Sequence, residues 1–495
     1  MDTPRLAVAS GNRLGAEAAA EVARAGGNAV DACLASAVMA WVAEPFFASV
    51  AGSGFIAVRT PDGTVEIIDG NNAMPMGTPD EPGQGSERVF LDYSNGMYTY
   101  VGAGAVGVPG VLAAVHTAWQ RHGRIEWPAL FEDAIRAARE GFPFPKTSDF
   151  YLSVTYEPMW SRDPAAVAML TRDARLLREG ETIVQSELAD TLTTIAEQGP
   201  DALYGGELGE EITRTIAQRD GFMTLEDLKS YRAEVRMPIQ AEAFGWEIAS
   251  NPPPGVGGAV LVHMLALLEG ADLKDPVERM TAVVEAQRAA MGYRRERYQD
   301  PDGIAAAFQD ALQSLRGRSP ETTHSSSADA DGYVCSLTES NGYGAAVVVH
   351  GILLNNSLGE EELNPLGVHR LPPGSRCHSN MTPTIATGPG ITVGLGSPGA
   401  DRIVSAIVQT LLRLAIDNES LQDAVAGPRA HLDARPDGEL LCFELDLPGD
   451  ALPYTTRHFP EIHMYFGGLQ AASVSDDGAV EAVFDPRRSG GVALV

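Results

Sequence analysis

Two adjacent threonines are the feature of this sequence that most directly suggests chemistry. Thr322 and Thr323 follow Glu321, after a polar segment at residues 304–321 and before a β-rich run at residues 333–337. A threonine hydroxyl is a weak nucleophile and needs a base beside it. If the bond before Thr322 is cleaved, the freed α-amine of that residue can serve as the base. The residues alone leave a polar turn without chemistry as the alternative.

Other catalytic signatures are missing from the sequence. It has no G-x-S-x-G elbow, S-x-x-K, Walker A loop or H-E-x-x-H pair. His458 and His463 have no acidic partner at metal-ligand spacing, so we expect no metal site. Residues 102–107 match G-x-G-x-x-G, but Pro109 follows at once and no second strand ending in an acid lies at the expected spacing. We interpret this stretch as a tight strand-to-helix turn and expect no cofactor.

The composition indicates an ordinary globular protein. The chain has 495 residues, 44% hydrophobic and 21% charged, and a formal net charge of −30. That charge argues against nucleic acid or an anionic membrane as a partner, because both require a basic surface. Four cysteines lie far apart without a CxxC pair, so we expect no disulfide framework: Cys33, Cys335, Cys377 and Cys442.

The N-terminal region carries no pattern typical of export. The start shows no charged segment followed by an apolar one, so no signal peptide is expected. The longest apolar run, at residues 29–43, contains Asp31 and is too short to span a bilayer. These observations predict a cytoplasmic protein.

The pattern of elements predicts a layered α/β protein with sheets packed between helices. We expect two helices within residues 14–44, joined at residues 25–28 with Asn28 as an N-cap. The remaining expected elements are strands at 55–59 and 65–69, loop at 72–98, mostly helix to about 235, a loop at 251–258 before a helix, β-rich runs at 333–354 and 382–396, a helix at 402–417, and strands at 471–474 and 479–484.

A series of different short motifs runs along the chain from residue 25 to residue 488. In the N-terminal part they are residues 25–32, Glu44-Pro45 with the small-residue loop to residue 55, and residues 106–110, 225–231 and 252–255. In the C-terminal part they are residues 322–324, 329–332, 351–356, 381–384, 396–399, 428–429 and 485–488. Together they resemble the gamma-glutamyltransferase family over nearly the whole chain.

The resemblance implies a four-layer αββα Ntn-hydrolase fold formed by two chains from one autocleaved precursor. Cleavage between Glu321 and Thr322 would give a large, helix-rich subunit of residues 1–321 and a small, catalytic subunit of residues 322–495. The partners implied are these two subunits and a small-molecule amide or peptide-like substrate. Thr322 would attack the amide and form an acyl-enzyme, which water or an acceptor amine then resolves.

The resemblance also assigns further catalytic roles. Gly399 and Ala400 would donate backbone N–H groups to the oxyanion. The family has a second glycine where this chain has Ala400, and we expect a negative φ there, at which a methyl group is tolerated. Ser340 would place a second hydroxyl against Thr322, with Asn341 beside it. The residues alone leave a hairpin turn at residues 340–342 as the alternative.

The residues that would bind a glutamyl group depart from the family pattern. Asn71 stands where the family has an arginine that clamps the donor α-carboxylate, and a neutral amide would not neutralise that charge. Ser379 and Asn380 stand where the family has a pair of serines, so one of the two is altered, and Glu360 stands where the family has an aspartate that holds the α-ammonium. A solvated loop at residues 360–362 is the alternative for Glu360.

Three functions follow as hypotheses. The first is an autoprocessing threonine amidohydrolase or acyltransferase acting on a gamma-glutamyl amide, such as glutathione, or a related acyl donor. The second is a family member acting on a non-glutamyl acyl group, because Asn71 replaces the arginine. The third is an uncleaved binding homologue without catalysis.

Overall fold

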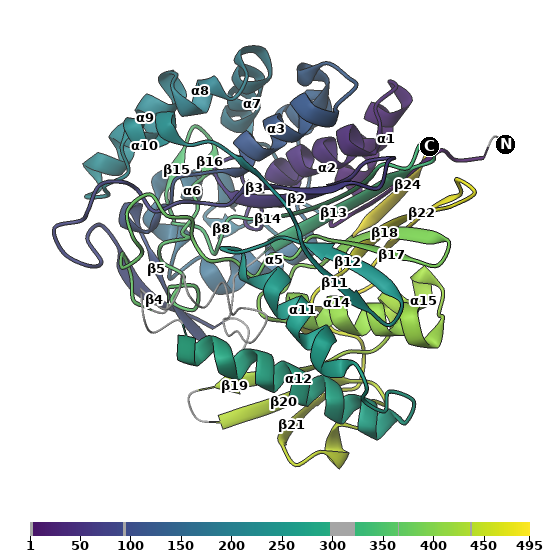
Figure 1. The fold of residues 1–495 in the computed structure, drawn as a ribbon. Helices are drawn as coiled ribbons and strands as arrows, with labels where there is room; N and C mark the ends of the chain where they lie inside the picture. The colour runs from purple at the N-terminus through teal and green to yellow at the C-terminus, as the bar shows by residue number, and fades with distance from the viewer. Residues whose placement is uncertain (1–2, 93–95, 298–321, 365, 436–437) are drawn as a thin grey trace.

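Two stacked β-sheets, each covered by helices on its outer face, form the centre of the molecule (Figure 1). The computed structural model describes residues 3–92, 96–297, 322–364, 366–435 and 438–495. The mixed α/β arrangement with sheets between helices confirms the expectation from the sequence.

The first sheet contains the strand that begins at Thr322. Within the described residues it has seven strands in the order β10-β3-β2-β14-β13-β1-β24, each antiparallel to its neighbours. These strands are β1 (Leu6–Ser10), β2 (Ser53–Arg59), β3 (Val65–Gly70), β10 (Glu234–Arg236), β13 (Thr322–Asp329), β14 (Val334–Ser340) and β24 (Gly491–Leu494). Strand β13 therefore lies inside the sheet, between β14 and β1.

The second sheet faces the first across a thin apolar core. Its described strands, in the order β11-β12-β17-β18-β22-β23, are β11 (Ile239–Ala243), β12 (Trp246–Ser250), β17 (Thr384–Gly388), β18 (Ile391–Gly396), β22 (Gln470–Ser475) and β23 (Val480–Phe484). Phe55 and Val334 of the first sheet pack with Ile385 and Ala472 of the second. Strands at 55–59, 65–69, 471–474 and 479–484 were predicted and are confirmed.

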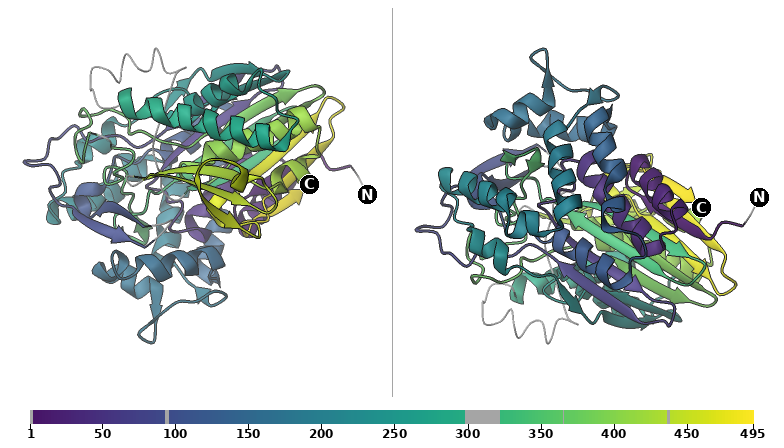
Figure 2. Two further views of the ribbon diagram at one scale, coloured as in Figure 1. Left: turned by 90° about the horizontal axis from the view of Figure 1, so that it is seen from below. Right: turned by 90° about the horizontal axis from the view of Figure 1, so that it is seen from above.

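One layer of helices covers the first sheet, and Figure 2 shows it from above as the purple and blue helices over the strands. It is built on α1 (Arg13–Arg24), α2 (Ala29–Ala43) and α3 (Val111–His122), which contact β13, β14, β2, β3 and β24. Every residue of α2 is buried, as its apolar sequence predicts. Asn28 caps α2 and forms a capping box with Asp31, so the predicted helix pair and its junction are confirmed.

Further helices extend this layer. They are α4 (Glu132–Glu140), α5 (Lys146–Thr155), α6 (Pro164–Leu170), α7 (Ser186–Gln198), α8 (Asp201–Tyr204), α9 (Glu207–Gln218) and α10 (Leu225–Ser230). Two short strand pairs with two residues in each strand lie among these helices: β6 (Phe142–Pro143) with β9 (Thr182–Ile183), and β7 (Thr171–Arg172) with β8 (Arg175–Leu176). A third such pair, β15 (Val348–Val349) with β16 (Ile352–Leu353), comes later in the chain. The mostly helical stretch predicted to about residue 235 is confirmed.

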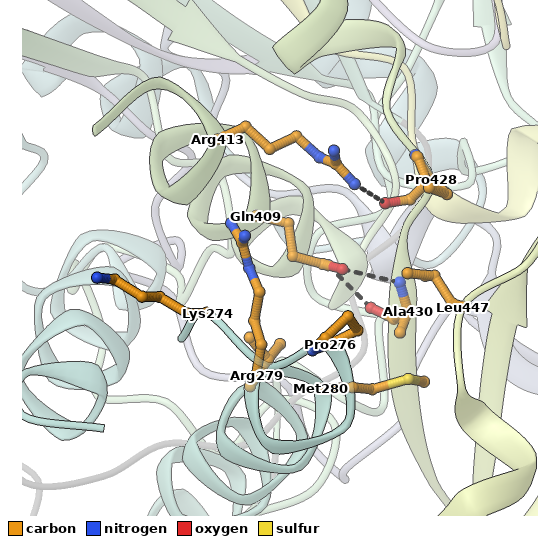
Figure 3. A pocket seen from close by; sticks show the side chains of 10 residues that line it. Lys274, Pro276, Arg279, Met280, Gln409, Arg413, Pro428, Ala430 and Leu447 are labelled. Carbon is orange, nitrogen blue, oxygen red and sulfur yellow. Dashed lines mark hydrogen bonds between the residues drawn. The ribbon is translucent and has the colours of Figure 1, made fainter. Parts of the chain in front are cut away.

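A second layer of helices covers the other sheet and carries a small sheet of its own. It contains α11 (Val256–Leu268), α12 (Pro276–Arg297), α14 (Arg402–Leu412), which a π-helical turn extends to Asp417, and α15 (Leu421–Ala426). The small sheet, β19 (Ala430–Arg435), β20 (Gly438–Glu444) and β21 (Thr455–Phe459), packs on α12. A cavity of about 180 Å³ lies where α12, α14 and β19 meet, and Gln409 bonds to both backbone groups of Ala430 across it (Figure 3).

One predicted loop is partly wrong. Residues 72–98 were expected to lack strands, but β4 (Glu87–Leu91) pairs with β5 (Met97–Val101). Val89, Leu91 and Val101 bury their side chains against the core, and this burial outweighs the turn-forming glycines and prolines around them. The linker expected at residues 304–321 lies outside the described residues.

The structure also bears on the expectations about membrane helices, metal sites, cysteines and the glycine-rich turn. No helix there is long and apolar enough to cross a membrane. No group of three or more His, Cys, Asp and Glu side chains among the described residues is placed to hold a metal ion. All four cysteines are buried free thiols. Within the G-x-G-x-x-G match, Ala103–Ala105 form a short 3-10 turn between β5 and α3.

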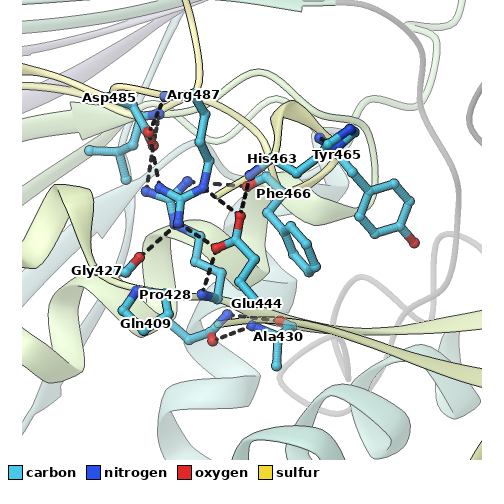
Figure 4. Close-up of polar contacts among 12 residues, drawn as sticks. Gln409, Gly427, Pro428, Ala430, Glu444, His463, Tyr465, Phe466, Asp485 and Arg487 are labelled. Atoms are coloured by element: carbon cyan, nitrogen blue, oxygen red, sulfur yellow. Dashed lines mark hydrogen bonds and ion pairs between the residues drawn. The ribbon is translucent and has the colours of Figure 1, made fainter. Parts of the chain in front are cut away.

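A buried ion cluster fastens the end of β23 to β20 and to the segment after α15 (Figure 4). The Arg487 guanidinium lies 2.5 Å from Glu444 and 3.0 Å from Asp485, and Arg429 lies 2.6 Å from the other oxygen of Asp485. All four side chains are almost completely buried. Burial alone would raise the pKa of Asp485, but the two arginines outweigh it and hold that pKa below its ordinary value.

We predict that Arg487→Met lowers the free energy of unfolding by about 3–5 kcal/mol, because it leaves two buried carboxylates short of a cation. Chemical denaturation of the purified protein measures this. Arg175→Met is the control, since the Arg175–Glu181 pair is exposed and its loss should change stability little. Equal effects of the two substitutions would contradict the role given to the cluster.

Candidate active site

Thr322 lies in a row of three buried hydroxyl residues on neighbouring strands. As the first residue of β13 it is directly opposite Ser340 of β14, and Ser340 is directly opposite Ser53 of β2. Directly opposed residues of antiparallel strands point to the same face of the sheet, so Thr322 and Ser340 lie side by side. Thr322 is 1% exposed. The structure therefore brings together the predicted nucleophile and the predicted second hydroxyl.

The face that carries Thr322 is the one between the two sheets. His324 points the same way, two residues along β13, and a Cβ on Gly396 of β18 would lie only 2.3 Å from its ring. The ring bonds to Thr338 at 2.8 Å and to Ser326 at 2.7 Å. Burial lowers the pKa of His324 to about 3, so this imidazole is neutral at physiological pH and acts as a spacer between the sheets.

The segment after Gly396 carries the predicted oxyanion donors. Gly399 has φ of 124° and packs against Gly467, whose Cα would be 2.9 Å from a Cβ at position 399. Ala400 has φ of 66°, so the expected negative φ is wrong, because the turn into α14 holds this residue in the left-handed region. Among the described residues, neither Gly399 nor Ala400 donates its backbone N–H to an acceptor. Two adjacent N–H groups are thus available for an anion.

A buried glutamate, Glu44 of the Glu44-Pro45 motif, lies on the other face of β13. Thr323 donates its hydroxyl to Glu44 at 3.0 Å, and Asn12 donates to the same carboxylate oxygen at 2.6 Å. Burial raises the pKa of Glu44, which these hydrogen bonds and the charge of Arg488 only partly oppose. An acid at the end of an apolar helix, followed by proline, is the sequence feature that could have indicated a buried carboxyl.

A second buried carboxyl stands beside this one. Glu339 is directly opposite Thr323 on β14 and accepts a hydrogen bond of 2.7 Å from the indole of Trp41. Burial raises its pKa well above the ordinary value, and the charge of Glu44 adds to the rise. Behind the strand, Glu44 therefore holds Thr323, and with it the start of β13, by a hydrogen bond, whereas the side chain of Glu339 bonds to Trp41.

The residues predicted to bind the donor carboxylate lie together. The Asn71 side chain donates to the Cys377 carbonyl at 2.5 Å, and Ser379 follows two residues later. The Ser379 carbonyl accepts the N–H of Val256 at 2.7 Å, at the start of α11, and Asn380 continues the same segment. The structure thus joins Asn71, Ser379 and Asn380 in one polar wall.

A nearby arginine does not replace the clamp that the family has at position 71. Arg376 donates to the Asn71 carbonyl at 2.9 Å and to the Arg232 carbonyl at 2.5 Å. Its guanidinium also lies 4.1 Å above the ring of Tyr231. The Arg376 cation therefore bonds to backbone carbonyls and pairs with Glu234 at 3.7 Å, and one of the two N–H groups of the Asn71 amide is bonded to Cys377.

Asn341 and Glu360 carry polar atoms with unfilled hydrogen-bonding capacity. Within the described residues, the Asn341 side-chain amide has no hydrogen-bond partner at either its oxygen or its nitrogen. The Oε2 atom of Glu360 also has none, and all three atoms are buried. Burial raises the pKa of Glu360 well above its ordinary value, and the charge of Glu362 adds to the rise. Glu360 is 3% exposed, so the alternative of a solvated loop is wrong for it.

The segment after Asn341 is not a hairpin turn. Strand β14 ends at Ser340 and pairs with β13 and β2, whereas the next strand along the chain, β15, pairs with β16. The hairpin alternative for residues 340–342 is therefore wrong. Asn341 instead donates its backbone N–H to Phe47 at 3.2 Å, which holds it beside the small-residue loop before β2.

Comparison with known proteins decides the family. The family described as Gamma-glutamyltranspeptidase matches residues 15–317 and 306–495. The chain belongs to the gamma-glutamyltranspeptidase family. It is therefore an Ntn hydrolase that acts on amide bonds, and the resemblance drawn from the motifs is confirmed.

Several relatives in this family are similar over nearly the whole chain. "Acylase ACY 1 proenzyme" of Pseudomonas sp. (strain SE83) is 31% identical, covering 96% of this chain and 90% of the relative. "Glutathione hydrolase proenzyme" of Escherichia coli (strain K12) is 27% identical, covering 97% and 90%. The crystal structure of cephalosporin acylase from Bacillus halodurans shares the fold, with a TM-score of 0.81 at 24% identity over 99% of this chain and 96% of that one.

We predict that Ala400→Gly raises the free energy of unfolding by about 0.5–1 kcal/mol. A left-handed backbone costs a residue with a Cβ about 1–2 kcal/mol, of which the greater freedom of glycine in the unfolded chain cancels a part. Ala406→Gly, within α14, is the control and should destabilise by about 1 kcal/mol. Urea denaturation measures both, and equal losses from both variants would contradict the assigned strain.

Proposed function

We propose that the protein is an autoprocessing threonine amidohydrolase in which Thr322 becomes the N-terminal nucleophile. Cleavage between Glu321 and Thr322 gives subunits of residues 1–321 and 322–495, which stay associated through the sheet that they share. Both relatives quoted above are named proenzymes, which supports cleavage of a precursor. Glu321 lies outside the described residues.

The observation that carries the proposal is the pairing of Thr322 with Ser340 on the inner face of the first sheet. The Gly399–Ala400 turn follows β18, which faces the start of β13, and it offers two N–H groups that no described residue uses. A nucleophile, a neighbouring hydroxyl and paired N–H donors are the parts that acyl transfer needs.

The proposed reaction has two halves. Thr322 Oγ attacks the amide carbon while its proton passes to the Thr322 α-amine, and the oxyanion accepts hydrogen bonds from Gly399 and Ala400. The C–N bond then breaks, and the ammonium returns the proton to the leaving amine. Water attacks the resulting ester by the same route, which releases the acid and restores Thr322. An acceptor amine in place of water gives transfer.

The acyl donor that we favour lacks an α-carboxylate. Asn71 is a neutral amide that donates one of its two N–H groups to Cys377, and the Arg376 cation bonds to backbone carbonyls and pairs with Glu234. A desolvated carboxylate would therefore find no free cation at this wall, and leaving it unpaired is costly. The similarity to an acylase supports a donor other than gamma-glutamyl.

Gamma-glutamyl hydrolysis is the second candidate because of Glu360. Its buried carboxyl has one oxygen without a partner, and a donor ammonium would supply that partner and ionise the group. The similarity to a glutathione hydrolase supports this candidate.

We predict that Thr322→Ala remains one chain of about 52.4 kDa and hydrolyses no amide, because it lacks the hydroxyl that both steps use. Thr322→Ser, which keeps a hydroxyl, is the matched control and should still divide into two chains. A denaturing gel after prolonged incubation separates the outcomes. Two fragments from Thr322→Ala would place the scissile bond elsewhere.

We predict that 4-aminobutyryl-4-nitroanilide is cleaved with a kcat/KM at least equal to that of gamma-glutamyl-4-nitroanilide. The two substrates differ only in the α-carboxylate, for which the Asn71 wall provides no free cation. Release of 4-nitroaniline measures both. A preference of about tenfold or more for the gamma-glutamyl substrate, the size expected of a charge-assisted contact, would instead establish the second candidate.

A further inference from the structure

The start of β13 extends beyond the strand that covers it on one side. Strand β1 ends at Ser10, which lies opposite Ser325. The next backbone bond on this side, from the Gly11 N–H to the His324 carbonyl at 3.1 Å, is the last one among the described residues. The neighbour on the other side, β14, continues to Thr322. On the side of β1, the backbone ladder therefore stops before it reaches Thr322.

A bridge of three side chains takes over where this ladder ends. Glu44 accepts the Thr323 hydroxyl at 3.0 Å and the Asn12 amide at 2.6 Å, both on one carboxylate oxygen. Asn12 is the N-cap of α1, and Glu44 is the C-cap of α2. The bridge therefore fastens the start of β13 to the ends of two helices.

The backbone at Gly11 closes over this bridge. A Cβ at this position would lie 2.4 Å from the Thr323 hydroxyl oxygen and 3.2 Å from a carboxylate oxygen of Glu44. Glu44 is 7% exposed and Thr323 is 3% exposed, so water is largely kept from the hydrogen bond between them. In such surroundings a hydrogen bond is stronger than in water.

Arg488 supplies a positive charge beside the bridge. Its stem lies on Gly468, where a Cβ would be 2.1 Å from the Arg488 Cγ, and its guanidinium lies 5.9 Å from the ring of Phe47, three residues after Glu44. Burial raises the pKa of Glu44, and the hydrogen bonds of the bridge and the charge of Arg488 oppose this rise. Arg488 therefore favours the ionised form of Glu44, which accepts hydrogen bonds more strongly than a neutral carboxyl does.

Two carboxyls buried close together cost stability. Glu339, directly opposite Thr323, is the second, and burial and the charge of Glu44 both raise its pKa, so that it stays protonated. Apolar side chains of similar volume commonly pack at such places with equal or greater stability. This chain has the carboxyls one residue from Thr322, and local rules are broken in this way chiefly at functional sites.

Cleavage before Thr322 would make the bridge more important. The new N-terminus would have no covalent anchor on its outer side, and the ends of strands open more readily than their interiors. Thr323 is the next residue along the chain, and its side chain is bonded to the helix ends through Glu44.

We propose that Glu44 is a positioning residue for the nucleophile: with Arg488 as its counter-charge, its carboxylate fixes Thr323 and thereby the place of Thr322 Oγ. Glu44 touches no reacting atom in this scheme, because Thr322 and Thr323 point to opposite faces of β13. The inference rests on the proposed amidohydrolase function, but the fixing of the strand can be measured without catalysis.

The first test measures hydrolysis of the better of the two 4-nitroanilides above, with kcat expressed per divided chain. We expect Thr323→Val and Glu44→Gln each to lower kcat about tenfold, the size expected of one hydrogen bond to a charged group. KM should not change, because the substrate touches neither side chain. Thr323→Ser keeps the hydroxyl and should retain the wild-type kcat.

Combined variants show whether these residues act through one contact. Glu44→Gln together with Thr323→Val should lower kcat no more than the larger single loss. Arg488→Met should lower kcat in the wild-type protein but not further in Glu44→Gln. Thr60→Val is the matched control, since it removes a hydroxyl that donates to Asp62 at 2.5 Å in an exposed turn, and it should leave kcat unchanged. A double variant whose loss equals the product of the two single losses would overturn the inference.

The second test is amide hydrogen exchange of the peptide that begins at Thr322. Thr323→Val and Glu44→Gln should each speed exchange of the first amides of β13 about tenfold and leave the amides of β18 unchanged. Unchanged exchange, or an unchanged kcat in both variants of an active enzyme, would overturn the inference and leave the amidohydrolase scheme standing. Faster exchange in a protein that neither divides nor hydrolyses an amide would overturn the scheme and leave the anchoring of β13 by Glu44 standing.

Discussion

The register of β13 between β1 and β14 is the constraint on which the candidate site depends. Successive residues of a strand point to opposite faces, so pairing Thr322 with Ser340 sends Thr322 between the sheets and Thr323 toward the helices. A slip of one residue would exchange the two threonines and bury Thr322, the proposed nucleophile, against Glu44. Thr323, Glu44 and Asn12 form hydrogen bonds that only the observed register allows.

The spacing of the two sheets follows from the same strand. His324 fills the gap between them and requires a glycine at position 396, because any Cβ there would overlap the imidazole. Beyond that glycine the chain turns through Gly399 and Ala400 into α14, and Ala400 has a strained φ at the turn to which we assign the oxyanion donors. The two faces of β13 thus have different surroundings: Glu44 holds Thr323 on the helix side, and Thr322, which we propose as the nucleophile, lies on the side between the sheets.

Local patterns predicted much of the fold. The capping box at Asn28, the apolar α2 and the alternation of β2 and β3 are readable because each depends on residues close in sequence. Strand β4 was missed because its support comes from burial against distant residues. The motifs and the family resemblance named the candidate site residues, but not the φ of Ala400 or the bonding of Asn71 to Cys377. Those features depend on how segments far apart in the chain meet.

The central claim is that Thr322 becomes a free N-terminus. The most direct measurement is the intact mass and N-terminal sequence of each polypeptide in the purified wild-type protein. If cleavage occurs between Glu321 and Thr322, we expect two chains, of which the smaller begins Thr-Thr-His-Ser-Ser and ends at Val495. A single polypeptide of 52.4 kDa that persists unchanged, or a smaller chain that begins at any other residue, would contradict it.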